Sequence, residues 1–302
     1  MHHELLCSIH STLHTKEMLE DCGASGLPKS SRDLLDQLLC RRVDGCFFYR
    51  NACLNEKCSE CGGLSKFDTC FHEGCEQDLG KIIVKKKVYE TMKYTLKSGG
   101  ESSRCELVGK DINVASFISD FKENLFYKYA RHSHRSQWLD QQFRMCKDTF
   151  PIGTIISVVD FAENYTLQPQ NETQSQYYNS IQIAIFVHIT YRHALDSAED
   201  NRKIIREYHF YMSDDRSHSH EFVQHCFENY FDFLHEHAIA MNRHIIWSDN
   251  CTGQFKNARM FYWLCRMHVE RGVPHIWSFF EFGHGKGEHD GAGACVKRAL
   301  VK

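Results

Sequence analysis

The sequence predicts an α/β protein in which a mixed β-sheet is flanked by helices, preceded by a helical connector and a cysteine-rich region. Three observations carry this prediction. In residues 151–302, apolar runs of β type alternate with helical patterns. Residues 81–150 combine a basic run with apolar residues at three- and four-residue intervals. Residues 1–80 are rich in cysteine and histidine and are punctuated by glycine.

The cysteine-rich region, residues 1–80, predicts a zinc site. The chain holds 15 cysteines, and an odd number without a secretory signal favours reduced or metal-bound thiols over disulfides. Cys58-x2-Cys61 has the spacing of a zinc knuckle, in which a tight turn presents two thiolates to one ion. Cys53 is a third candidate ligand. The fourth comes from Cys40, Cys46, Cys70 or Cys75, and the predicted set is Cys40, Cys53, Cys58 and Cys61.

A second, upstream set has weaker spacing for a metal site. It consists of Cys7, His10, His14 and Cys22. The alternative is that these are thiols and surface histidines without a metal.

The connector, residues 81–150, is predicted to be mostly helical and locally basic. Its lysines at 81–97 would add affinity for the phosphates of a nucleic acid with little specificity for base sequence. The alternative is that they form a solvated helix face. A break at 98–104 is followed by a run of apolar residues that would share one helical face. These are Val114, Phe117, Ile118, Phe121, Leu125 and Phe126.

After a boundary at Pro151–Gly153 the pattern predicts the order β-β-β-α-β-α-β-α. The expected strands are 154–160, 180–192, 204–212, 244–248 and 275–282, and the expected helices are 218–241, 256–271 and one from about 291. This order is that of the ribonuclease-H-like fold. The chain stops at Lys302, about three turns into the last helix, so we expect that helix to be truncated.

Three segments carry acids at positions that this fold would bring together. Asp160 and Asp249 end apolar β-type runs, and Asp290 follows a glycine-rich turn before the last helix. Converging carboxylates bind Mg²⁺ or Mn²⁺, and two such ions are the usual machinery of phosphodiester chemistry. Glu288 is a competing third acid, and Glu163 is a candidate outer ligand.

Basic residues near the acids are predicted to contact phosphates. They are Lys256, Lys286, Lys297 and Arg298. The glycines between 283 and 293 would let a bound strand approach the backbone closely. Another interpretation is a metal site formed by the pair His284 and His289 with Asp290, for which no further partner is identifiable.

The motifs DFAENY, WSDNCTGQFKN and HGKGEHDGAG..VKRA resemble a set of uncharacterised, transposon-derived proteins with a DDE/DDD transposase-like, ribonuclease-H-like core. The resemblance covers roughly residues 120–302. It implies DNA strand transfer or nuclease ancestry, and it implies Asp290 rather than Glu288 as the third acid. From it we expect a transposase- or integrase-like protein that acts on DNA, with a nuclear location.

Composition sets limits on these expectations. The net charge of −3 gives no global signal for nucleic acid, so a binding surface must be a local patch. No apolar run approaches the about 18 residues of a membrane span, so we expect no membrane association; a homo-oligomer is compatible with the sequence. Two alternatives stay open: an inactive, domesticated DNA-binding or protein-interaction zinc protein, and a nuclease acting on RNA or RNA–DNA hybrids.

Overall fold

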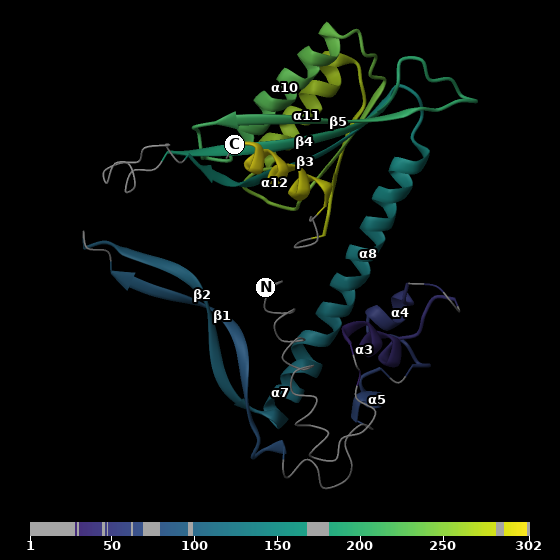
Figure 1. The fold of residues 1–302 in the computed structure, drawn as a ribbon. Coiled ribbons are helices and arrows are strands. Elements are labelled where there is room, and N and C mark those ends of the chain that lie inside the picture. Colours follow the sequence, from purple (N-terminus) through teal and green to yellow (C-terminus); the bar gives the residue numbers. More distant parts are fainter. Residues whose placement is uncertain are drawn as a thin grey trace. The chain divides into compact units, whose positions relative to one another are not determined.

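The chain divides into two compact units, Met1–Trp138 and Leu139–Lys302. Figure 1 shows the computed structural model, with the elements labelled. The structure describes residues 28, 30–43, 46, 48–61, 63–68, 79–95, 99–167, 181–281 and 287–300. The division falls twelve residues before the boundary expected at Pro151, inside one long helix, α8 (Phe126–Thr149).

The first unit packs short helices against a longer helical segment. Its elements are α3 (Ser31–Leu38), α4 (Asn51–Leu54), α5 (Ser65–Asp68), β1 (Ile83–Thr95), β2 (Glu101–Asn113), α7 (Val114–Asp120), the π-helical turn η1 (Phe121–Leu125) and the start of α8. The apolar face predicted at 114–126 is confirmed, because Val114, Phe117, Phe121 and Phe126 are all buried in the core of this unit.

The prediction of helix was wrong for residues 83–113. β1 and β2 pair antiparallel along their whole length, from Ile83 opposite Asn113 to Thr95 opposite Glu101. No third strand covers this ribbon among the described residues, so its side chains are mostly exposed or half-buried. The apolar–polar alternation that marks a half-buried strand is therefore weak, and lysine and glutamate at exposed positions favour a helical interpretation.

The second unit is built on one five-stranded mixed sheet in the order β5-β4-β3-β6-β7. Its strands are β3 (Thr154–Thr166), β4 (Gln182–His193), β5 (Ile204–Ser213), β6 (Arg243–Ser248) and β7 (His275–Phe279). β3, β4 and β5 are antiparallel neighbours, whereas β6 pairs parallel with both β3 and β7. The predicted mixed sheet flanked by helices is confirmed, with all five strands in the expected order.

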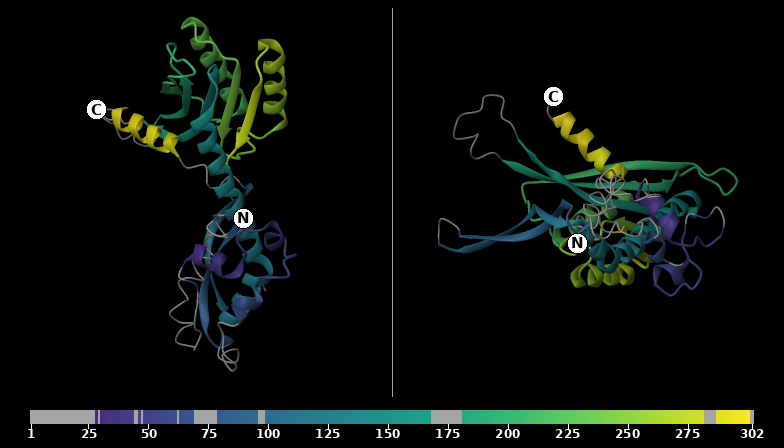
Figure 2. Two further views of the ribbon diagram at one scale, coloured as in Figure 1. Left: turned by 90° about the vertical axis from the view of Figure 1, so that its right-hand side faces the viewer. Right: turned by 90° about the horizontal axis from the view of Figure 1, so that it is seen from below.

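Helices cover both faces of this sheet (Figures 1 and 2). On one face α10 (His220–Glu236) and α11 (Ala258–Arg271) pack against Ile155, Val159 and Ile246. On the other face α12 (Glu288–Leu300) and the end of α8 pack against the alternate side chains, Ile156 and Val158 among them. Because successive side chains of a strand point to opposite faces, the apolar run of β3 supplies both cores.

A chain of polar side chains, buried except for the half-buried His275, crosses four strands on the α10/α11 face. The Ser157 hydroxyl lies 2.7 Å from Nε2 of His188 and 2.8 Å from Nε2 of His244, and His244 Nδ1 lies 3.1 Å from Nδ1 of His275. Burial lowers the pKa of His188 and His244 well below the ordinary value. These imidazoles are therefore neutral in the folded protein, and they form hydrogen bonds inside an otherwise apolar core.

No described helix combines the length and the apolarity needed to cross a bilayer.

Candidate functional site

Hydrogen bonds around residues 36–50 bring Cys40 next to Cys53. Arg41 and Tyr49 form an isolated antiparallel bridge, and Asp36 accepts hydrogen bonds from the Arg41 guanidinium at 2.6 Å and from the Tyr49 hydroxyl at 2.7 Å. The Arg50 amide donates to the Cys40 carbonyl at 2.9 Å. Cys40, at the end of the α3 segment, thereby comes next to Cys53 on α4.

The Cys58–Cys61 turn supplies two more thiols. The backbone amides of Glu60 and Cys61 donate hydrogen bonds to the sulfur of Cys58 and lower its pKa to about 6. Burial has the opposite effect on Cys53 and raises its pKa to about 12. Amides that point at a sulfur stabilise the thiolate form, which is the form that binds metals.

The four sulfurs of Cys40, Cys53, Cys58 and Cys61 all lie within 4.8 Å of one another. Sulfurs about 2.3 Å from a tetrahedral zinc ion are about 3.8 Å apart, a spacing compatible with this limit. The four predicted ligands therefore form a cluster that could bind a metal such as zinc. Cys46 lies outside it, and Cys70, Cys75 and the upstream set at residues 7–22 fall outside the described residues.

The strand order brings Asp160 and Asp249 to the same edge of the sheet. β3 and β6 run parallel and side by side, and the last pair in register is Val159 opposite Ser248. The two acids follow this pair directly. Asp249 lies just after the end of β6, as expected, whereas Asp160 lies inside β3, which continues to Thr166 and does not end at the acid. Each is fixed by a backbone amide: Phe161 donates to Asp160 at 2.8 Å, and Cys251 donates to Asp249 at 3.0 Å.

The first turn of α12 brings His289 and the third predicted acid, Asp290, close to Asp160. Nε2 of the buried His289 lies 3.2 Å from a carboxylate oxygen of Asp160 and 3.7 Å from one of Asp290. The two carboxylates are therefore no further apart than these distances combined. Gly293 permits this packing, since a Cβ atom there would lie 3.0 Å from the Cβ of Ala162.

Burial and the negative charge of Asp160 raise the pKa of Asp249, and the amide of Cys251 opposes the shift. A cation placed between the carboxylates would relieve this repulsion. Their oxygens do not converge as tightly as the sulfurs, because among the described residues the cysteine cluster is the only group of three or more ligand atoms within 4.8 Å.

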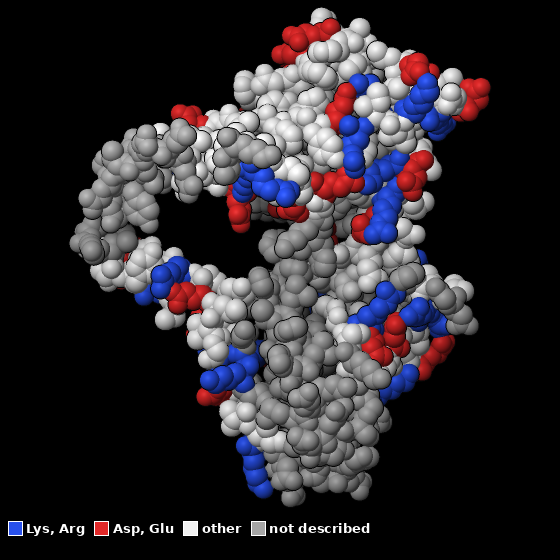
Figure 3. Space-filling model, in the orientation of Figure 1, with Lys and Arg blue, Asp and Glu red and all other residues white. Residues whose placement is uncertain are grey.

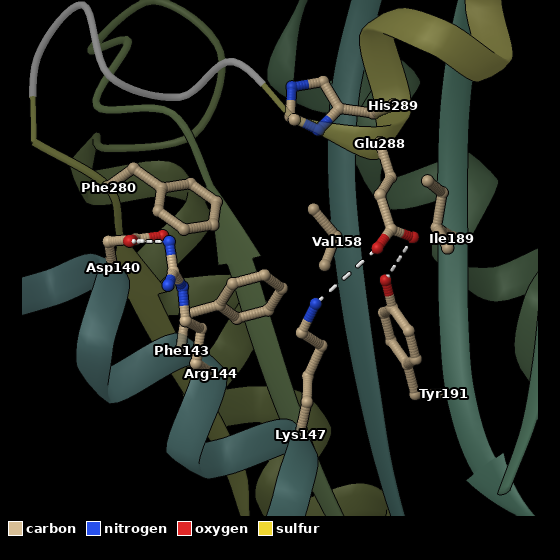
Figure 4. A pocket seen from close by; sticks show the side chains of 11 residues that line it. Asp140, Phe143, Arg144, Lys147, Val158, Ile189, Tyr191, Phe280, Glu288 and His289 are labelled. Carbon is tan, nitrogen blue, oxygen red and sulfur yellow. Dashed lines mark hydrogen bonds and ion pairs between the residues drawn. The ribbon is translucent and has the colours of Figure 1, made fainter.

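Glu288 takes part in a different network and not in the acid cluster (Figure 4). Its carboxylate accepts a hydrogen bond from the Tyr191 hydroxyl at 2.6 Å, pairs with Arg206 at 2.9 Å and lies 3.7 Å from the Lys147 ammonium. Burial raises the pKa of Glu288, but these partners outweigh it and the net shift is downward. Glu163 is almost fully exposed and lies 3.8 Å from Lys297.

The predicted phosphate-binding residues lie at several places. Lys297 lies beside Glu163, Arg298 donates to the Ala294 carbonyl of its own helix at 3.3 Å, and Lys256 lies 5.3 Å from the centre of the Phe279 ring. Lys286 falls outside the described residues. On the face in Figure 3, positive and negative side chains are interspersed, so that view shows no uniform basic surface.

Two histidines near the acids were not predicted in their observed positions. His289, a candidate metal ligand with His284 and Asp290, lies between Asp160 and Asp290, and His284 falls outside the described residues. His218 stacks on Phe161, with ring centres 4.2 Å apart, and contacts the Asn164 side chain at 2.8 Å. No sequence signal marks His218, because it lies in an irregular stretch before α10.

A pocket of about 190 Å³ adjoins the acid cluster within the second unit (Figure 4). It lies between the end of α8, the sheet and the first turn of α12. His289 is common to the acid cluster and to the pocket wall. The lining is Asp140, Phe143, Arg144, Lys147, Val158, Ile189, Tyr191, Phe280, Gly287, Glu288 and His289.

A family model described as a domain of unknown function (DUF8701) matches residues 139–302, more than half of the chain. The chain belongs to this family, and the matched range coincides with the second compact unit. Comparison with curated proteins and with solved structures gave no match.

Proposed function

We propose that this member of the DUF8701 family carries a ribonuclease-H-like site for metal-dependent cleavage or transfer of DNA phosphodiester bonds. Two observations support the proposal: Asp160 and Asp249 follow neighbouring positions of β3 and β6, and His289 lies close to both Asp160 and Asp290. Three antiparallel strands followed by two parallel ones, in the order β5-β4-β3-β6-β7, support the fold assignment.

The carboxylates would hold one or two Mg²⁺ or Mn²⁺ ions, which activate a nucleophile and stabilise the leaving oxygen. Asp160, inside β3, and Asp249, directly after β6, suit this role because their short side chains hold the charge close to a rigid backbone. His289 would orient the Asp160 carboxylate through its ring nitrogen. Water or a 3′-hydroxyl would lose its proton and attack the phosphorus. The P–O bond opposite the attacking oxygen would break, and the strand end that carries the leaving oxygen would depart.

The motif resemblance supports a transposase- or integrase-like activity over a general nuclease. In that setting the cysteine cluster of the first unit would bind DNA or a protein partner. Lys256, Lys286, Lys297 and Arg298 remain candidates for phosphate contacts along the substrate.

The test is cleavage of labelled duplex DNA with Mn²⁺ or Mg²⁺. We expect Asp160→Asn to lower the cleavage rate by about 100-fold or more, the scale on which removal of one transition-state contact acts. The control is Asp232→Asn, an exposed acid of α10, which should cleave like the wild type. Equal cleavage by the wild type and Asp160→Asn would remove the acid cluster from the mechanism.

A second candidate is a zinc protein that binds DNA or a partner without catalysis. The tight cysteine cluster favours it, since the carboxylates show no comparable convergence in the described residues. Absence of cleavage and of Mn²⁺ binding by the wild type, together with zinc-dependent DNA binding, would support this candidate over the first.

A further inference from the structure

We infer that the pocket beside His289 takes a nucleobase of the substrate strand, next to the phosphodiester at the acid cluster. This inference rests on the proposed function for its substrate, but it concerns a separate cavity and a separate measurement. Figure 4 shows the side chains that carry it.

The pocket lies between α8 and the sheet and has both apolar and charged lining residues. Phe143 and Lys147 lie one turn apart on α8, and Val158 and Ile189 lie on the sheet opposite them. Phe280 contributes a second ring, with its centre 5.2 Å from that of Phe143 and the planes perpendicular. Rings and aliphatic side chains of this kind provide surfaces on which a planar ring can stack.

Charged groups of the lining balance one another, and the Lys147 ammonium lies 4.5 Å from the centre of the Phe143 ring. Arg144 pairs with Asp140 at 2.7 Å, and Lys147 lies 3.7 Å from Glu288. An anionic ligand would meet both carboxylates as well as both cations, so the lining gives it no net advantage. A wholly apolar ligand would deprive Lys147 and Glu288 of water without replacing their hydrogen bonds.

A neutral planar ring with donors and acceptors on its edge meets these requirements. Its faces would contact the apolar lining residues, and its edge would accept from Lys147 and donate to Glu288. The volume of about 190 Å³ is smaller than that of typical pockets for drug-sized ligands. A single base is a ligand of this size and chemistry.

The pocket lies close enough to the acid cluster for one nucleotide to reach both. His289 lines the pocket and also lies 3.2 Å from Asp160. One imidazole therefore separates the cavity from the acid cluster. A nucleotide with its base in the pocket would have its own phosphate, or the next one, near the three acids.

The experiment measures binding without turnover. A fluorescein-labelled 12-nucleotide single-stranded DNA is titrated with the full chain in Ca²⁺, and an abasic residue is moved along it one position at a time. We expect one position, or two adjacent ones, to lower the affinity about tenfold, the scale of one stacked base. Uniform effects at all positions, or no binding of this DNA, would overturn the inference.

Two variants of lining residues test whether the effect of the abasic position arises at the pocket. Phe143→Leu and Lys147→Met should each abolish the difference between the intact and the abasic strand. The controls are Phe261→Leu, an exposed ring of α11, and Lys203→Met, whose lysine pairs with Asp196. A position effect that persists in both pocket variants would contradict the inference. Loss of cleavage in Mn²⁺ is a separate readout and bears on the proposed function.

Discussion

At the scale of single residues, Asp249 has surroundings that oppose its charge. It lies half-buried after β6, beside the carboxylate of Asp160, and burial is the largest cause of its raised pKa. The hydrogen bond from the Cys251 amide, which is typical of an Asp in a turn, offsets only part of this cost, because the net shift of the pKa is still upward. A carboxylate that binds a cation would have such a raised pKa when the ion is absent, because the charge that stabilises it is missing.

The raised pKa predicts that Asp249→Asn stabilises the protein at pH 7 in the absence of divalent cations. Between 3.8 and the folded pKa the native state binds more protons than the unfolded state. The free energy of unfolding of the wild type therefore falls as pH rises through this window. Asparagine keeps the oxygen that accepts from the Cys251 amide. Urea unfolding should show a gain that shrinks as pH approaches 3.8.

Asp232→Asn, in an exposed part of α10, is the control and should show no such gain. Added Mn²⁺ should stabilise the wild type more than Asp249→Asn. A variant that is less stable than the wild type at pH 7 would show that the carboxylate is held by favourable contacts, contrary to this account.

Some residues of the candidate site could be predicted from the sequence and others could not. Asp160 and Asp249 were predictable because each directly follows a run of strand-forming apolar residues. The contact of His289 with Asp160 spans more than a hundred residues, and only the packing of α12 on β3 creates it. The cysteine at position 40 was one of four candidates, because spacing marks a Cys-x2-Cys turn but not its distant partners.

At the scale of elements, the acid cluster depends on how closely α12 packs against β3. Glu288 anchors the first turn of α12 to β4, β5 and α8 through Tyr191, Arg206 and Lys147. Gly293 then brings the helix against Ala162 of β3. His289 and Asp290 lie between these two points of attachment, and their positions follow from both.

Two glycines of α12 provide a matched test. Gly293→Val should destabilise the protein by about 1–3 kcal/mol, the cost of overpacking a filled interior. It should also weaken Mn²⁺ binding by displacing His289 and Asp290. Gly291→Val introduces the same side chain into the same helix, at a place where a Cβ atom meets nothing within 4 Å. Thermal unfolding and Mn²⁺ titration of both variants measure the difference, and equal effects would remove Gly293 from this role.

The elements that the sequence predicted well are those with two buried faces. β3 and β4 read as nearly continuous apolar runs because helices cover both sides of the sheet. Within the part of the chain that the structure describes, β1 and β2 pair only with each other, and they carry lysines and glutamates at exposed positions, so their composition indicated helix. The chain of polar side chains from His188 to His275 was also unpredictable, since each histidine alone resembles a surface residue.

At the scale of the whole molecule, the two units use different sources of stability. The second unit has a five-stranded sheet with apolar cores on both faces. In the first unit, α4 and α5 have four residues each, and Cys53 and Cys61 are part of the core itself. Such short helices have little stability of their own. A metal bound by the four cysteines would join the α3 segment, α4 and the Cys58–Cys61 turn.

We therefore expect the purified chain to carry one zinc ion and a chelator to unfold the first unit selectively. Structural zinc contributes about 10–16 kcal/mol of apparent binding free energy in small domains. Hydrogen exchange with a chelator should rise across residues 31–68 and 114–130, while β3 to β7 keep their protection. Cys58→Ser should lose the metal, whereas Cys46→Ser should retain it, because Cys46 lies outside the cluster. A metal-free wild type with unchanged exchange in the first unit would mean that its apolar core is sufficient and that the four thiols need no ion.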